Sequence, residues 1–190
     1  MKNKTIMSIL SILLVCVCLS ACAKNVSEKD FVHKTVEAKT PYFESLEQLE
    51  KEADVIVRGK KIEDLESLVN GSGFTFATLS AFELSEIIKD TSGLLEKDDI
   101  INVLENEYKE KNVIWHVADY TIMNTDDEYM LFLTANVHGE MKYYTPLGVN
   151  FGVTCLGEDY LMNSYKSGLP ETDADDPVNL IREEVRKKYM

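Results

Sequence analysis

The stretch "DVIVRGKKI", residues 54–62, is the clearest sign that the folded part of this chain is built on a β-sheet. Val55, Ile56 and Val57 are consecutive β-branched residues, which is typical of a strand buried on both faces. Just before this stretch, Ser45 is suited to cap a helix, because Gln48 stands at the capping-box spacing. The sequence therefore predicts a short helix over about residues 46–52 that leads into a buried strand.

Further apolar segments with strand character follow as far as residue 155. They are "FTFATLSAFELSEIIKD" (74–90), "DDIINVLE" (98–105), "YMLFLTA" (129–135), "MKYYTP" (141–146) and "LGVNFGVTC" (147–155). The glycine-containing turn "NVHGE", residues 136–140, predicts a hairpin between the third and fourth of them. In the last segment the apolar residues alternate strictly, so we expect a half-buried strand over residues 147–155.

The end of the chain has the pattern of a helix. Asp176 is suited to cap it, Pro177 to stand at its first position, and Arg186, Lys187 and Lys188 to interact with the negative end of its dipole. About six strands between two helices predict a small α+β domain over residues 41–190. Its sheet is expected to be a small curled antiparallel sheet or an OB-like β-barrel, with one N-terminal helix and one C-terminal helix.

The first residues have the signature of an export signal. Lys2 and Lys4 precede about fourteen mostly apolar residues, a run shorter than the ~20 needed to cross a bilayer. Leu19-Ser20-Ala21-Cys22 follows, and it resembles the bacterial lipobox. The resemblance implies cleavage between Ala21 and Cys22, and a diacylglycerol on the Cys22 thiol. The alternative is a plain signal peptide in which this cysteine is incidental.

A lipid on Cys22 would tie the protein to the outer face of a bacterial cell membrane, since two acyl chains hold stably. We expect a leader over residues 1–21, and a lipidated cysteine with a flexible stalk over residues 22–40. The chain carries a formal charge of −13, and removing two leader lysines leaves 18 basic against 33 acidic residues, or −15. Such a charge argues against nucleic acid as a partner and against a domain that lies flat on the membrane.

The cysteine count excludes an internal disulfide in the mature chain. Cys16 and Cys18 would leave with the leader and Cys22 would carry lipid, so Cys155 would be the remaining thiol. In the alternating strand predicted over residues 147–155, Cys155 lies on the same face as the apolar residues, where a thiolate is disfavoured. We therefore predict a buried structural cysteine in preference to a nucleophile.

No metal, cofactor or catalytic residue is predicted. His33, His116 and His138 lack the spacing of zinc ligands, although His116 beside Trp115 could form a small stacking site. The acidic clusters at residues 125–128 and 173–176 resemble calcium ligands but do not continue into an EF-hand loop. A solvated turn and a helix cap are the favoured interpretations of these two clusters.

Several stretches taken in order resemble a group of uncharacterised lipoproteins of Gram-positive bacteria. They are "EADVIVRGK", "EIIKD", "DDIINVLE", "DDEYMLFL" and "YYTPLGVNFGV", within about residues 42–156. The resemblance implies lipid anchoring and brings no established activity. The layout is also similar to the OB barrel of netrin-type modules and tissue metalloproteinase inhibitors. Those inhibitors use a free amino-terminal cysteine, and here Cys22 would be blocked by lipid.

Two classes of function remain. The favoured one is a surface-tethered, non-catalytic module that binds an envelope protein or a small ligand. The alternative is a cell-envelope enzyme or enzyme inhibitor, whose site would be assembled from residues scattered along the chain. A pocket that gathers His116, Asp119 and Tyr120, or Tyr143 and Tyr144, would favour the alternative, whereas a filled barrel with an exposed apolar patch would favour partner binding.

Overall fold

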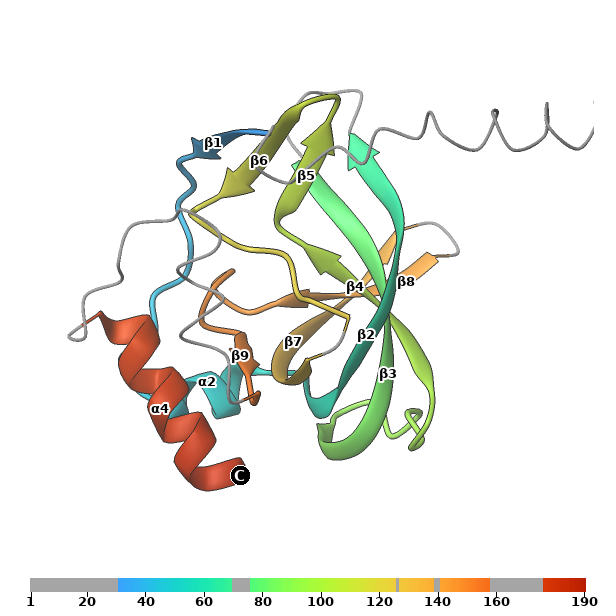
Figure 1. Ribbon diagram of the computed structural model, residues 1–190. Coiled ribbons are helices and arrows are strands. Elements are labelled where there is room, and N and C mark those ends of the chain that lie inside the picture. The colour runs from blue at the N-terminus through green and yellow to red at the C-terminus, as the bar shows by residue number, and fades with distance from the viewer. Residues whose placement is uncertain (1–30, 70–75, 126, 139–140, 158–175) are drawn as a thin grey trace, which may run out of the picture. The chain divides into compact units, whose positions relative to one another are not determined.

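A computed structural model describes residues 31–69, 76–125, 127–138, 141–157 and 176–190, which from Val32 onward belong to one compact unit (Figure 1). The fold is mixed α+β, with a closed five-strand β-barrel, a smaller curled sheet and two helices. The predicted fold class is thereby confirmed. The predicted leader with Ala21 and Cys22 and the acids at 173–175 lie outside the described residues.

The barrel has the strand order of an OB fold. Its strands are β2 (Val55–Val69), β3 (Phe76–Asp90), β4 (Ile100–Glu105), β7 (Glu128–His138) and β8 (Met141–Pro146). They run in the order β2-β3-β4-β8-β7, and a further pairing of β2 with β7 closes the ring. The β4–β8 contact is parallel and the other four are antiparallel. This is the five-stranded Greek-key barrel of OB domains.

Apolar side chains fill the inside of this barrel. The cluster includes Val55, Val57, Phe82, Leu84, Val103, Leu131, Leu133 and Tyr144. Gly59 lets β2 and β3 come close at one point, because an added Cβ would lie 2.0 Å from the carbonyl oxygen of Glu83. The run "VIV" is continuously buried for the expected reason, since Val55 and Val57 face the barrel core while Ile56 faces a second core outside it.

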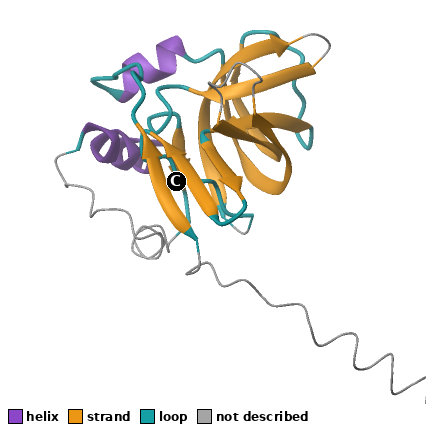
Figure 2. Ribbon diagram, turned by 90° about the horizontal axis from the view of Figure 1, so that it is seen from above, coloured by secondary structure: helices purple, strands orange, loops and turns teal. Residues whose placement is uncertain are grey.

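Two helices cover that second core, and Figure 2 shows them next to each other on one side of the strands. They are α2 (Leu46–Glu52) and α4 (Pro177–Tyr189), and both begin where the sequence predicts. The Ser45 hydroxyl accepts a hydrogen bond from the Gln48 amide, and Asp176 accepts one from the Val178 amide. Their apolar faces pack against the outward residues of β2 and β7, namely Ile56, Met130 and Phe132.

A second, three-stranded sheet lies beside one end of the barrel. It contains β1 (Val32–Val36), β5 (Glu107–Glu110) and β6 (Val113–Val117) in the order β1-β6-β5, with β1 parallel to β6. The predicted stalk over residues 22–40 is therefore wrong over β1. This segment is polar and shows no hydrophobic periodicity. It forms a strand because it pairs with the edge of β6, more than seventy residues later in the chain.

The predicted strand over residues 147–155 is also wrong in its first half. β8 ends at Pro146, and the chain turns before β9 (Val153–Cys155) resumes pairing with β7. The backbone of Phe132 bridges the excursion, because its oxygen accepts from Leu147 and its amide donates to Gly152, both at 2.9 Å. Positive φ angles at Gly148 and Val149 reverse the chain between these two residues. The alternating apolar residues of this segment thus pack into two different cores, Val149, Val153 and Cys155 into the barrel core and Leu147 and Phe151 into the second core, and they do not form one continuous strand.

None of the helices in the described residues combines the length and the apolar character that a membrane crossing requires.

Candidate functional site

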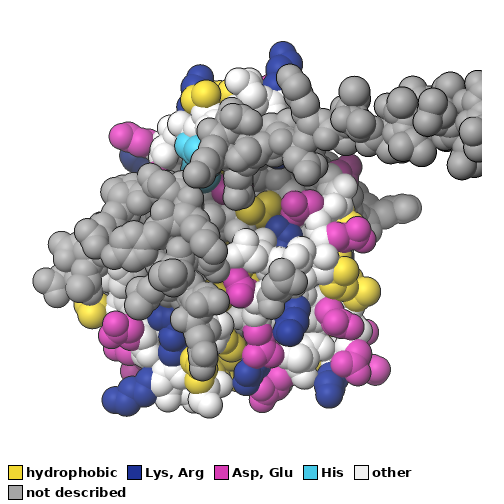
Figure 3. Space-filling model, in the orientation of Figure 1, with side chains coloured by type: hydrophobic (Ala, Val, Ile, Leu, Met, Phe, Trp, Pro, Cys, Tyr) yellow, Lys and Arg dark blue, Asp and Glu magenta, His cyan; other side chains and the backbone are white. Residues whose placement is uncertain are grey.

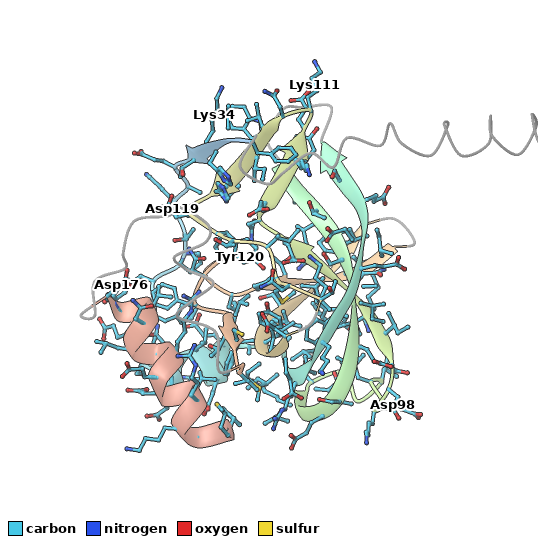
Figure 4. The ribbon with its side chains drawn as sticks, in the orientation of Figure 1. Lys34, Asp98, Lys111, Asp119, Tyr120 and Asp176 are labelled. Atoms are coloured by element: carbon cyan, nitrogen blue, oxygen red, sulfur yellow. The ribbon has the colours of Figure 1, made fainter. Side chains whose placement is uncertain are left out.

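Polar side chains converge inside the molecule where β2, β3 and β4 meet the segment 118–124. Lys61, Ser80 and Glu105 are buried here, and Lys61 and Glu105 are only 3% and 0% exposed. Figure 4 shows Tyr120 near the centre of the view, with Asp119 at the end of β6. We call Lys61, Asp64, Ser80, Glu105 and Tyr120, with the backbone of Met123, the buried polar network.

The Lys61 ammonium has an acceptor for each of its three hydrogens. It lies 2.8 Å from Glu105 Oε1 and 2.6 Å from Asp64 Oδ1, and it donates to the Met123 carbonyl oxygen at 2.9 Å. Asp64 is the one member of these pairs that reaches solvent, since its side chain is 56% exposed. A buried ammonium is costly unless it is paired in this way. Lys61 therefore connects the barrel wall to the segment that crosses its mouth.

The Glu105 carboxylate is the centre of the network. Its Oε1 accepts from the Ser80 hydroxyl at 2.5 Å, and its Oε2 accepts from the Tyr120 hydroxyl at 3.0 Å and from the Met123 amide at 2.6 Å. Burial raises the pKa of Glu105, while Lys61, the Met123 amide and the Ser80 hydroxyl act in the opposite direction. Burial and the neighbouring Glu105 also raise the pKa of Tyr120 well above its usual value.

A second polar cluster joins β1 to β6. His116 Nδ1 lies 2.8 Å from the Tyr120 carbonyl oxygen and 3.1 Å from Glu107 Oε2, while its Nε2 lies 2.9 Å from His33 Nδ1. The hydrogen bond with Glu107 is the main cause that raises the pKa of His116. Two residues after His33 on β1, the Thr35 hydroxyl donates to Asp119 at 2.8 Å. These contacts attach the first strand to the rest of the unit.

The structure brings together some of the residues that we singled out as a possible reactive site. His116, Asp119 and Tyr120 do lie close to one another, but each polar group already contacts a side chain or carbonyl of the protein. General acid or base catalysis needs a group within hydrogen-bond reach of a substrate. Tyr143 and Tyr144 occupy successive positions of β8, and Tyr144 is buried in the barrel core.

The other candidate residues have local structural roles. Cys155 is buried in β9, and burial raises the pKa of its thiol, which favours the structural interpretation. Glu128 pairs with Arg58 at 2.6 Å, and Asp127 accepts from the Asn124 amide group at 3.0 Å. No cluster of three or more His, Cys, Asp or Glu suited to a metal ion occurs within the part of the chain that the structure describes.

Sequence reasoning missed the polar residues that matter most for the interior. Alternate residues of a strand point to the same face. Lys61 stands an even number of positions after Val55, Val57 and Gly59, so "VIVRGKK" already predicts a charged side chain on the inward face of the strand. Glu105 likewise shares the parity of Ile101 and Val103 in β4. A charge on the apolar face of a predicted strand was the available signal for this network.

On the outside, the second half of β2 is uncovered. Residues 62–67 are all exposed, whereas their partners on β3 are buried. In Figure 1 this half of β2 runs along the right-hand side of the barrel, and Figure 3 shows many acidic side chains on that side. We call residues 62–67 the β2 edge. It is the candidate surface for contact with another molecule.

Comparison with known proteins adds no relative, because the sequence matches no protein-family model and no curated protein at a significant level.

Proposed function

We propose that this protein is a lipoprotein of the outer face of a bacterial cell membrane, and that its folded unit is a non-catalytic module that binds an envelope partner. The anchor rests on Leu19-Ser20-Ala21-Cys22, which ends an apolar run behind two lysines. The binding role rests on the barrel. The members of its buried polar network contact one another, while the β2 edge faces solvent.

The state of the buried polar network is the observation that carries the choice of a binding role over catalysis. Burial raises the pKa values of both Glu105 and Tyr120, a property that often marks an active site. Here both are almost fully buried, and they are hydrogen-bonded to each other. A substrate would have to displace these contacts before it could reach either group. The network is better explained as the device that holds the segment 118–124 across the mouth of the barrel.

The anchor is tested by replacing the proposed lipidated residue. Cys22→Ala should move the protein from the membrane fraction to the medium, and it should abolish incorporation of a labelled fatty acid. The matched control is Cys18→Ala, which lies in the apolar run and should leave both readouts unchanged. Retention of the Cys22→Ala protein in membranes after a high-salt wash would remove the basis for the anchor.

The binding role is tested separately by chemical crosslinking on intact cells. The wild-type chain should give a discrete crosslinked species that an unrelated lipoprotein carrying the same first 22 residues does not give. Recovery of lipid alone from the wild-type chain would contradict the binding role and leave the anchor untouched.

A further inference from the structure

The second half of β2 pairs with a neighbouring strand of the barrel on one side, whereas its first half pairs on both sides. Residues 55–60 pair with β3 on one side and with β7 on the other, but β7 begins at Glu128, opposite Lys60. From Lys61 to Val69, β2 pairs only with β3 among the described residues. Among the backbone hydrogen bonds that described residues form outside the strand ladders, none involves this stretch either. One row of its backbone amides and carbonyls therefore faces outward.

Open strand edges normally carry features that prevent unwanted pairing. Two such features are present here. The β2–β3 register shifts between Lys61 and Glu63 and again between Asp64 and Glu66, so the strand is bulged twice. The sequence of the β2 edge, Ile-Glu-Asp-Leu-Glu-Ser, also contains three acids and no base. An antiparallel pairing of two copies would place acids near acids, which is destabilising.

The acidic side chains of the β2 edge also favour a positively charged partner. Asp64 is engaged by Lys61, whereas Glu63 and Glu66 take part in none of the salt bridges between described residues. Ile62 and Leu65 are 40% and 46% exposed between these acids. The edge thus combines backbone hydrogen-bonding groups, two carboxylates that form no salt bridge with a described basic residue, and two apolar side chains, all within about 20 Å of strand.

We propose that the β2 edge binds an extended segment of another protein that carries Lys or Arg, by adding it as a strand to the barrel. In this mode, main-chain hydrogen bonds supply affinity, and the side chains beside them supply selectivity. Basic residues of the added strand face Glu63 and Glu66, and its apolar residues contact Ile62 and Leu65. This inference rests on the proposed binding role and names its surface and its class of partner.

The test uses the full chain, purified in detergent from cells that express it, and three labelled peptides. The first is an eight-residue peptide in which Lys alternates with Val and Thr. The second replaces Lys by Glu, and the third keeps the charge but has Pro at two central positions. Anisotropy should show binding of the first peptide alone. Hydrogen exchange should show that this peptide protects amides within residues 62–67.

A charge-reversal variant assigns the contact to the acids. Glu63→Lys/Glu66→Lys should weaken binding of the Lys peptide about tenfold and allow binding of the Glu peptide. The control is Glu96→Lys/Glu183→Lys, which changes net charge equally at two exposed positions outside the edge and should alter affinity less than about twofold. Both variants should unfold at the urea concentration of the wild type, because all four positions are exposed.

Three results would overturn the inference. Equal binding of the proline-containing peptide would mean simple charge attraction without strand addition. Protection of residues 62–67 that depends on protein concentration, without peptide, would make a second copy the occupant. Unchanged affinity of the edge variant would place the contact elsewhere. If the edge variant still gives the crosslinked species on intact cells, the binding role stands and only its assignment to this edge fails.

Discussion

Replacing Glu105 by glutamine tests whether the buried polar network holds the barrel mouth closed. The side chain keeps its shape, but four donors now face one carbonyl oxygen and one amide group that is itself a donor. The Tyr120 hydroxyl and the Met123 amide both point at Oε2, and the Lys61 ammonium and the Ser80 hydroxyl point at Oε1. Whichever way the amide is turned, two donors lose their acceptor.

The expected cost is large for a substitution of one atom. Removing one partner of a buried ion pair costs about 3–5 kcal/mol, which already includes the charge left without a partner. For a unit of this size, that loss lowers the melting temperature by roughly 6–20 °C. Urea unfolding, followed by the fluorescence of Trp115, should show a lower midpoint at an unchanged slope, because the amount of surface exposed on unfolding stays the same.

Glu83→Gln is the matched control, since Glu83 is exposed on the neighbouring strand and should change stability by about 0.5 kcal/mol or less. Lys61→Met/Glu105→Leu removes both charges together and should recover part of the loss, because a buried pair replaced by apolar side chains of similar size is often tolerated. A cost below about 1 kcal/mol for Glu105→Gln would refute the reasoning. It would mean either that Glu105 is already neutral in the wild type, or that water accepts the hydrogen bonds of the donors around it.

Three further predictions concern other parts of the unit. Because Glu107 raises the pKa of His116 in the folded state, this histidine stabilises the fold below about pH 6.5, and the contribution disappears as the pH rises through the raised pKa. The difference in unfolding free energy between wild type and His116→Gln should therefore shrink as the pH rises from about 6 to about 9. Although partial burial acts against it, hydrogen bonds from the amides of Ser92, Leu94 and Leu95 and from the Ser92 hydroxyl lower the pKa of Asp90 to about 2. Asp90→Asn should cost about 1 kcal/mol at neutral pH, and the cost should vanish as the pH falls from about 4 through 2, as urea midpoints would show. Gly59→Ala should lower the unfolding free energy by about 3 kcal/mol, because its Cβ would overlap the Glu83 carbonyl oxygen, whereas Gly157→Ala meets only a side-chain oxygen at 3.2 Å and should be nearly neutral.

Each of these predictions has a contrary outcome that the same titrations would reveal. A difference for His116→Gln that grows with pH would mean that its neutral form is the stabilising one. If Asp90→Asn still lowers the unfolding free energy at low pH, the charge of the Asp90 carboxylate is not what stabilises this loop. A folded, stable Gly59→Ala protein would show that β2 and β3 separate more easily than their close approach implies.

The parts of the fold that sequence reasoning predicted well depend on local signals. The caps of α2 and α4 use residues within three positions of each helix start, and the buried run at residues 55–57 shows its character without a partner. The β5–β6 hairpin was missed because Lys109, Glu110 and Lys111 interrupt the alternation of its strands. β1 depends on a distant partner and leaves no local signal.

The candidate site was harder to predict than the fold. His116 and Tyr120 were singled out, but the sequence does not state that Glu105 lies under Tyr120 or that Glu107 lies beside His116. Those neighbours come from two strands of different sheets, β4 for Glu105 and β5 for Glu107, so their distances depend on how the sheets fold together. The same limit explains residues 147–155, where a single backbone residue of another strand decides that the chain leaves the sheet.

The closure of the ring by β2 and β7 has a consequence for how the protein is made. Val55 pairs with Leu133, a separation of 133 − 55 = 78 residues, so β2 and β3 are synthesised long before the strand that seals them. Pairings between distant segments form slowly, and unsealed sheets are prone to aggregate in the meantime. Until β7 has been made, the first half of β2 therefore has no strand to pair with on that side.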